Sequence, residues 1–366
     1  MIRVTLESLV KRHDKVAVVD HASLEIRPGE LAFLLGPSGS GKTALGRLVA
    51  GLDDLDEGEI YFDGRVVHTL PPVERRVGLV FQDDALWPHL SVAENVGYGL
   101  KVRGVPRRDR RERVIEALGV VGVEGLADRR PDSLSPLQKV RVGMARAVVI
   151  EPELLILDDP LARLEPRARP EFRDELRRLH AELGTTTLVL TSDPREALAM
   201  ADRLAVIDLG RVVQVGAPGE VYNLPADAFV ARFLGPANLI QGQVESTDAR
   251  GDVVVRTPLG RLIGRASAGP IESGTSVTVA IRPESIGLGP TVPPGSNRFA
   301  ATLERQTFLG DVRQVDLRGP GDWPVSALAL QSQSGGLREG QGVTASVAPE
   351  MVVVLPGKYA GRTDRE

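Results

Sequence analysis

The sequence predicts a largely parallel α/β domain followed by a smaller all-β domain. Three observations support this prediction. A glycine-rich loop lies between an apolar, strand-like run at residues 31–35 and a helical pattern at 44–50. Apolar strands alternate with helices through most of the chain before Gly235, which is typical of α/β folds. Beyond Gly235 the long helical patterns stop, and short β-like runs alternate with Gly/Pro turns.

The change of pattern around Gly235–Pro236 predicts a domain boundary at that point. The last stretch of the chain is polar, which favours a disordered tail. The predicted division is 1–235 for the α/β domain, 236–357 for the β domain and 358–366 for the tail.

The glycine-rich loop fills the pattern G-x-x-x-x-G-K-[ST]. Glycines let successive backbone N–H groups point at one phosphate, and the following helix adds its positive N-terminal end. Lys42 is expected to reach the terminal phosphates, and the Thr43 hydroxyl to ligate Mg²⁺. A Gly/Ser-rich surface turn is the simpler interpretation, but strand, loop and helix all stand in the required order, so we expect a nucleoside triphosphate site. Its candidate residues are Gly36, Pro37, Ser38, Gly39, Ser40, Gly41, Lys42, Thr43 and Ala44.

Short strands are expected on both sides of the loop, at 2–6, 15–19, 22–27 and 58–64. A further apolar strand at 77–81 has Gln82 at its carboxyl end. Ligands of open α/β sheets bind at the carboxyl ends of strands, so Gln82 is expected near the phosphates and the metal.

A helical pattern covers residues 91–121 and contains a very basic segment at 103–113. A basic run can contact nucleic acid. Glu112 and Glu116 are interspersed, however, and the net charge of the chain is −4, so we favour a solvated helix face and expect no nucleic-acid partner.

The remaining patterns before Gly235 continue the alternation. Helices are expected at 135–150 and 171–183, and strands at 153–157, 186–191 and 204–209. The first of these strands ends in Asp158–Asp159, two carboxylates at the edge where the phosphates are expected.

Composition excludes several classes of protein. The chain has no cysteine, which excludes disulfides and thiolate chemistry. No apolar run approaches the length of a membrane span, and the N-terminus has no signal-peptide pattern. We therefore expect a cytoplasmic protein without a span of its own, which can still work at a membrane through a partner.

In this order, the motifs resemble those of the ATP-binding subunits of ABC importers, in the branch with a C-terminal β domain that serves sugars, polyamines, sulfate or ferric iron. The resemblance covers nearly the whole chain. Besides the loop, the matching segments are VFQDDALWPHLSVAENVGYGL at 80–100, LLILDDP at 154–160, EALAMADRLAVIDLGRVVQVGAPGEVY at 196–222, IRPE at 281–284 and FLGD at 308–311.

The resemblance implies a P-loop ABC ATPase domain with a helical subdomain, followed by a TOBE or OB-like β domain. It implies ATP and Mg²⁺ as cofactors, with Asp158 holding the metal through water and Gln82 sensing the metal and the attacking water. Two such subunits dimerise head to tail, so that ATP lies between the P-loop of one and the LSGGQ motif of the other. The implied partners are transmembrane permease subunits and a second ATP-binding subunit, identical or different, at the inner face of the cell membrane.

The LSGGQ position departs from the family pattern and reads Leu134-Ser135-Pro136-Leu137-Gln138. Ser135 is retained as a candidate nucleotide contact, but both glycines are replaced. Proline has no N–H, and leucine adds bulk where the backbone must approach a phosphate. The same residues form a good helix start, with Ser135 as N-cap and Gln138 completing a capping box. The sequence therefore favours a structural role for this motif.

Other site positions also depart from the family. Asp159 stands where a glutamate polarises the attacking water, and Ser192 stands where a histidine contacts the γ-phosphate. Ala44 replaces a second hydroxyl after Thr43, and His13 takes the place of the aromatic ring that stacks on adenine. Asp159, Gln82 and Ser192 are the candidate catalytic residues, and Thr43, Gln82 and Asp158 are the candidate metal ligands.

Two interpretations follow from these departures. One is an importer ATPase that tolerates them; the other is a non-hydrolysing, regulatory or degenerate nucleotide-binding subunit. A soluble ABC protein of repair or translation is a third class, disfavoured by the β domain and the VAENV segment. We favour a transporter ATP-binding subunit with impaired hydrolysis, because one chain carries defects on both sides of a composite site.

Overall fold

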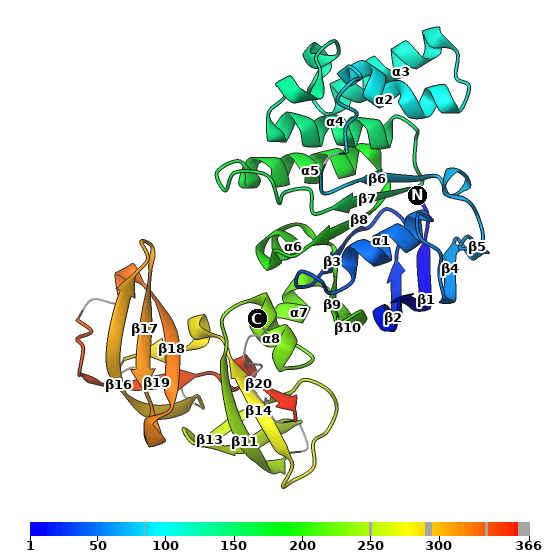
Figure 1. Ribbon diagram of the computed structural model, residues 1–366. Helices are drawn as coiled ribbons and strands as arrows, with labels where there is room; N and C mark the ends of the chain where they lie inside the picture. The colour runs from blue at the N-terminus through cyan, green and yellow to red at the C-terminus, as the bar shows by residue number, and fades with distance from the viewer. Residues whose placement is uncertain (84, 249–250, 290–294, 334–335, 358–366) are drawn as a thin grey trace. The chain divides into compact units, whose positions relative to one another are not determined.

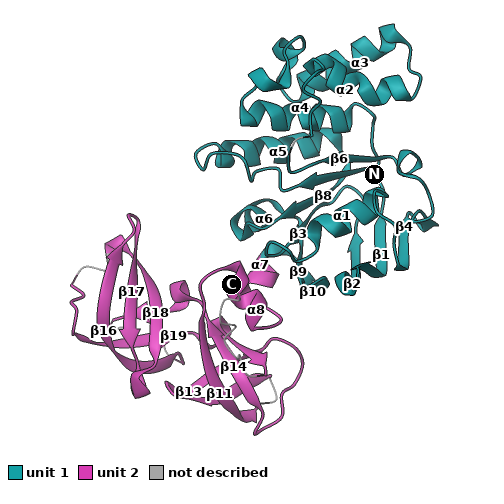
Figure 2. Cartoon of the chain, viewed as in Figure 1, with its two compact units in different colours: residues 1–218 teal, residues 219–366 magenta. Residues whose placement is uncertain are grey.

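The structure is a computed structural model that describes residues 1–83, 85–248, 251–289, 295–333 and 336–357. The predicted tail at 358–366 lies outside the described residues. The chain forms two compact units, Met1–Pro218 and Gly219–Glu366, coloured separately in Figure 2. The predicted succession of a largely parallel α/β domain and an all-β domain is confirmed.

The first unit is built around a six-stranded sheet in the order β10-β9-β3-β8-β7-β6 (Figure 1). All neighbours in this sheet pair in parallel except β10, which pairs antiparallel with β9. Both faces of the central strands are buried, which is why their sequences are continuous apolar runs. The strands are β3 (Leu31–Leu35), β6 (Val77–Val80), β7 (Leu154–Asp158), β8 (Thr186–Thr191), β9 (Arg203–Asp208) and β10 (Arg211–Gly216).

A four-stranded antiparallel sheet, in the order β2-β1-β4-β5, completes the sheets of this unit. Its strands are β1 (Val4–His13), β2 (Val16–Ile26), β4 (Glu57–Phe62) and β5 (Arg65–Val66). The helix α1 (Lys42–Ala50) shares one apolar core with both sheets. The predicted strands at 15–19 and 22–27 are a single strand, because His21 adopts φ 50° and the chain continues through an irregular register instead of turning.

Three helices form the helical subdomain of the first unit: α2 (Val92–Val102), α3 (Arg107–Val120) and α4 (Pro136–Val148). They pack on one another, and α4 also contacts β6 (Figure 1). The helical pattern at 91–121 is two helices rather than one, since Gly104 at φ 74° and Pro106 interrupt it. Two more helices, α5 (Arg169–Leu183) and α6 (Pro194–Met200), flank β8 in the sequence.

The second unit contains a closed five-stranded barrel and a five-stranded sheet that share one apolar core. The barrel strands are β11 (Asn238–Thr247), β12 (Asp252–Thr257), β13 (Gly260–Ala266), β20 (Val352–Pro356) and β14 (Ser276–Ile281). The sheet strands are β15 (Gly287–Leu288), β19 (Gly342–Val347), β16 (Asn297–Phe308), β17 (Val312–Arg318) and β18 (Pro324–Leu330). A closed five-stranded barrel matches the OB-like architecture expected for the β domain.

The helices α7 (Pro218–Asn223) and α8 (Ala228–Leu234) belong with the β unit, so the compact units divide earlier than the boundary expected at 235. The reason is packing and hydrogen bonding. Ala231 of α8 shares a small core with residues of β14 and β20. The Arg282 guanidinium donates to the carbonyls of Ala231, at 2.6 Å, and Tyr222, at 3.1 Å.

Within the described residues, no helix is long and apolar enough to cross a membrane.

A truncation after Pro218 is expected to give a soluble fragment that unfolds cooperatively. A truncation after Leu234 keeps α8 without the strands that cover it, and is expected to aggregate more readily. Size-exclusion chromatography and urea unfolding followed by circular dichroism compare the two fragments. A monomeric, cooperative 1–234 fragment beside a molten 1–218 fragment would contradict this division.

Candidate nucleotide-binding site

The loop between β3 and α1 lies at the carboxyl edge of the parallel strands. Leu35 pairs with Thr191 of β8, and the Gly36 N–H donates to the Thr191 carbonyl at 3.3 Å. Gly41 has φ 100°, and a Cβ there would lie 2.3 Å from the Val18 carbonyl oxygen of β2. A Cβ at Gly36 would meet the Ile207 carbonyl oxygen at 2.4 Å. These two glycines are therefore required by close backbone approach, as the motif predicts.

The Lys42 ammonium is buried and closes the loop on itself. Its Nζ donates to the carbonyl oxygens of Gly36, at 2.8 Å, and Pro37, at 3.0 Å. Burial lowers the Lys42 pKa, and the charges of Asp159 and Asp158 oppose that shift. A buried cation whose hydrogen bonds go to neutral carbonyls gains a charged partner when an anion enters the loop.

Thr43 and Asp158 meet beside the lysine. The Thr43 hydroxyl donates to Asp158 Oδ1 at 3.2 Å, and burial raises the Asp158 pKa. No cluster of three or more His, Asp or Glu side chains suited to a metal occurs in the described part of the chain. Mg²⁺ in nucleotide sites is held by one or two protein groups together with phosphates and water, so one hydroxyl and one carboxylate fit that ion.

Asp159 follows β7 with an unusual backbone. Its φ is 49°, and its N–H donates to the Leu190 carbonyl of β8 at 2.8 Å. The residue is half-buried, and burial raises the pKa of its carboxyl, with the neighbouring Asp158 charge acting in the same direction. This left-handed backbone conformation determines the direction of the Asp159 Cα–Cβ bond.

The structure places Gln82 and Ser192 along the same edge. Gln82 is exposed two residues after β6, and Ser192 is half-buried directly after β8. Parallel pairing of β6, β7, β8 and β3 brings the ends of all four strands together. The edge therefore gathers the predicted loop, the two aspartates, Gln82 and Ser192.

His13 and Ser135 belong to other elements. His13 is exposed at the end of β1 and pairs with Val16 of β2, the strand whose Val18 carbonyl lies against Gly41. The β1–β2 hairpin is thus next to the loop. Ser135 is exposed in the helical subdomain, where it is the N-cap of α4.

The predicted helix start at Ser135 is confirmed. Ser135 Oγ accepts from the Gln138 N–H at 3.3 Å, and Gln138 Oε1 accepts from the Ser135 N–H at 2.9 Å. Pro136 occupies the first helical position. The capping box therefore uses the Ser135 hydroxyl and the N–H groups of Ser135 and Gln138 in hydrogen bonds at the start of α4.

The sequence patterns did not predict a charged cluster that includes residues directly after Ser192. It contains Arg169, Asp193 and the almost fully buried Glu196. Burial raises the Glu196 pKa to about 7, although a hydrogen bond from Thr191 acts in the opposite direction. The run D-P-R-E at 193–196 has the pattern of a helix start and could have signalled α6. Nothing local in the sequence relates Arg169 to it.

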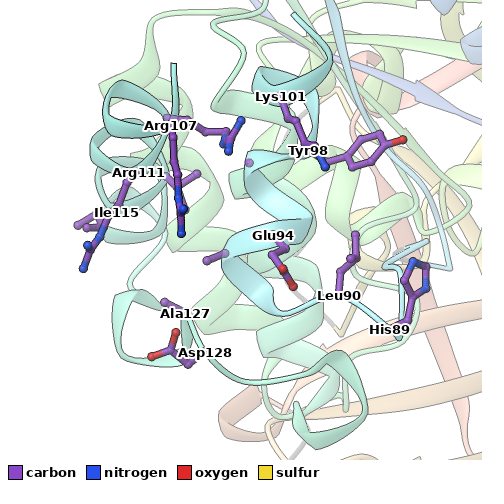
Figure 3. A pocket seen from close by; sticks show the side chains of 14 residues that line it. His89, Leu90, Glu94, Tyr98, Lys101, Arg107, Arg111, Ile115, Ala127 and Asp128 are labelled. Atoms are coloured by element: carbon purple, nitrogen blue, oxygen red, sulfur yellow. The ribbon is translucent and has the colours of Figure 1, made fainter. Parts of the chain in front are cut away.

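The helical subdomain also carries an open groove of about 580 Å³ between α2 and α3 (Figure 3). Glu94, Tyr98 and Lys101 line it from α2, and Arg107 and Arg111 from α3. The basic segment of the sequence therefore forms one wall of a surface groove.

Other arginines of that segment form exposed ion pairs. Arg108 lies 3.5 Å from Glu112, and Arg113 lies 3.1 Å from Glu151. Such pairs are typical of a solvated helix face.

Glu196→Gln is expected to change the pH dependence of stability. The Glu196 pKa is raised from its ordinary 4.5 to about 7, so the folded chain holds a proton that the unfolded chain releases within this window. The free energy of unfolding therefore falls as pH rises from about 5 to 7. The glutamine variant lacks this loss and should be more stable than the parent at pH 8, by on the order of 3 kcal/mol, with little difference at pH 5.

Urea unfolding at both pH values measures this difference. Glu182→Gln, which changes an exposed partner of Arg178, is the matched control and should show no pH-dependent gain. The same pH profile for both variants would show that Glu196 titrates like an exposed carboxyl.

Comparison with known proteins agrees with this geometry. A family model for ABC transporters matches residues 19–162, and one for the TOBE domain matches 279–355. A spermidine/putrescine import ATP-binding protein of Rubrobacter xylanophilus is 39% identical over 360 residues, 98% of this chain and 94% of that protein. An sn-glycerol-3-phosphate import ATP-binding protein of Rhizobium johnstonii is 42% identical over 317 residues, covering 86% and 84%.

Among solved structures, the chain resembles the dimeric ATP-binding cassette MJ0796 in a post-hydrolysis state with ADP and Pi. The two share a TM-score of 0.53 and 29% identity over 59% of this chain and 98% of that one. The chain is thus a member of the family of ABC importer ATP-binding subunits with a C-terminal TOBE domain.

Proposed function

We propose that this chain binds Mg-ATP at residues 36–43 and couples ATP binding and hydrolysis to solute import through membrane permease subunits. It works at the inner face of the cell membrane, paired with a second ATP-binding subunit, identical or different. The observation that carries the proposal is the buried Lys42 ammonium, held by two loop carbonyls beside the Thr43–Asp158 hydrogen bond. The relatives of this chain are import ATP-binding proteins for different solutes, and we propose that the membrane partners determine the cargo.

Each site residue has a definite part in this proposal. Lys42 exchanges its carbonyl partners for phosphate oxygens, and the N-terminus of α1 adds its positive potential. Thr43 and Asp158 hold Mg²⁺, which when bound offsets the charge of the phosphates. Gln82 and Asp159 hold and orient the attacking water.

Around these residues, Ser192 offers a hydroxyl beside the start of the loop. His13 offers a ring to the base, and Ser135 offers a hydroxyl to the partner subunit's nucleotide.

Lys42→Ala tests ATP binding. Removing charge-assisted hydrogen bonds to phosphate is expected to weaken Mg-ATP binding by about a hundredfold or more. Isothermal titration calorimetry measures the dissociation constant, with Lys101→Ala as a control that removes an exposed charge elsewhere in the same unit. Equal ATP affinity in the parent and the Lys42 variant would refute the site assignment.

We further propose that hydrolysis is slow, because three supports of the γ-phosphate are weakened together. Asp159 is one methylene shorter than glutamate, and about 1 Å of displacement can cost on the order of a hundredfold in rate. Ser192 is shorter than histidine and never cationic. At the opposing surface, Pro136 has no N–H to donate, and the Gln138 N–H is engaged in the capping box.

A repair series tests this proposal through the ATPase rate. The variants are Asp159→Glu, Ser192→His, the double Pro136→Gly with Leu137→Gly, and all four changes together. The effects of groups that act as a unit are strongly non-additive. Each repair alone should therefore raise the ATPase rate only slightly, and the combination should raise it by on the order of a hundredfold. Adding Lys42→Ala to the combination should abolish the gain. Turnover by the unmodified protein at about one per second or more would overturn the slow-hydrolysis proposal.

A non-hydrolysing, regulatory or degenerate subunit is the alternative. The observation that favours it is the self-contained capping box at Ser135, which engages the hydroxyl in α4. ATP binding without turnover, even alongside the permease and the second ATP-binding subunit, would support this alternative. A permease pair and a solute-binding protein in the neighbouring genes would support the importer.

A further inference from the structure

Arg169, the first residue of α5, links the start of α5 to the start of α6, which follows Ser192 in the chain. Its guanidinium NH1 lies 3.4 Å from Asp193 Oδ2 and 3.7 Å from Glu196 Oε1, and its Nε donates to the Leu164 carbonyl at 3.2 Å. Asp193 is the N-cap of α6, and Glu196 lies in the first turn of that helix. One cation therefore ties the segment after β7 to the segment after β8.

The same cluster is joined to the phosphate-binding loop through Thr191. The Thr191 hydroxyl donates to Glu196 Oε2 at 3.0 Å and accepts from the Asp193 N–H at 3.1 Å. The Thr191 carbonyl accepts from the Gly36 N–H at 3.3 Å. A continuous set of hydrogen bonds and ion pairs thus runs from Arg169 to the first residue of the loop, and it passes on both sides of Ser192.

Stability alone gives a poor account of this cluster. Partly buried ion pairs contribute little net stability, because removing the charges from water costs about as much as the pairing returns. The Glu196 side chain is 4% exposed and that of Arg169 is 31% exposed. Arg169 also interacts electrostatically with Asp159, so its charge lies near the carboxyl end of β7.

We propose that Arg169 is a positioning residue for the terminal phosphate of ATP: by bridging Asp193 and Glu196, it holds the Ser192 segment against the start of the loop. This inference rests on the proposed function, since it needs ATP at residues 36–43. ADP lacks the terminal phosphate and does not use the Ser192 segment. Arg169 therefore sets the preference for ATP over ADP without contributing to the part of the site that both nucleotides share.

The test measures two dissociation constants by calorimetry with Mg²⁺, one for ADP and one for the β,γ-imido analogue of ATP, so no turnover is involved. Arg169→Gln is expected to weaken analogue binding by about tenfold and to leave ADP binding within about twofold. Arg169→Lys, which keeps the charge, should recover most of the loss. Arg178→Gln, at an exposed ion pair on the same helix, is the matched control and should behave as the parent.

Asp193→Asn separates positioning from direct charge attraction, and it keeps a side chain able to cap α6. If Arg169 acts by holding the segment, loss of its Asp193 partner weakens analogue binding. If Arg169 simply attracts phosphate, removing a nearby negative charge strengthens it, and the inference is overturned. Equal changes for ADP and the analogue, or no change in Arg169→Gln, also overturn it.

The two proposals fail in different ways. If Lys42→Ala binds ATP as tightly as the parent, the proposed function itself is refuted. Intact Lys42-dependent binding with an unchanged nucleotide preference in Arg169→Gln would remove this inference alone.

Discussion

Parallel pairing in one sheet is the constraint on which the proposed nucleotide site depends. Because β3, β7 and β8 pair in parallel, the loop at Gly36, the aspartates after β7 and Ser192 all emerge at one edge. The pairing is itself fixed by apolar strands that are buried on both faces. The proposed site thus joins segments that are distant in the sequence, since Gly36 and Asp158 are more than 100 residues apart.

Burial gives the site its electrostatic character. The same loss of solvent lowers the Lys42 pKa and raises those of Asp158, Asp159 and Glu196. Each charged form is disfavoured when unpaired, so each group gains from an opposite charge placed beside it. An anion beside Lys42 and a cation beside Asp158 would each favour the charged form of its neighbour, which supports the proposed Mg-ATP site.

Local sequence patterns predict much of this structure, but they do not predict the features that depend on contacts between residues far apart in the sequence. The loop motif, the limits of β8 and the capping box at Ser135 depend on neighbouring residues, and the sequence predicted each of them. The irregular register at His21 depends on a backbone angle that the periodic pattern does not encode, whereas the break between α2 and α3 follows from Gly104 and Pro106, which the sequence does show. The packing of α8 with the β unit and the ion pairs of Arg169 join residues far apart in sequence, so single-sequence patterns carry no trace of them.

The two units have separate apolar cores. The core that surrounds α1 is drawn from residues between Ile2 and Ile207, and the core of the barrel and its sheet from residues between Ile240 and Val354. A large-to-small substitution in either core therefore leaves its cavity among residues of the same unit, so core variants can be used to destabilise one unit at a time.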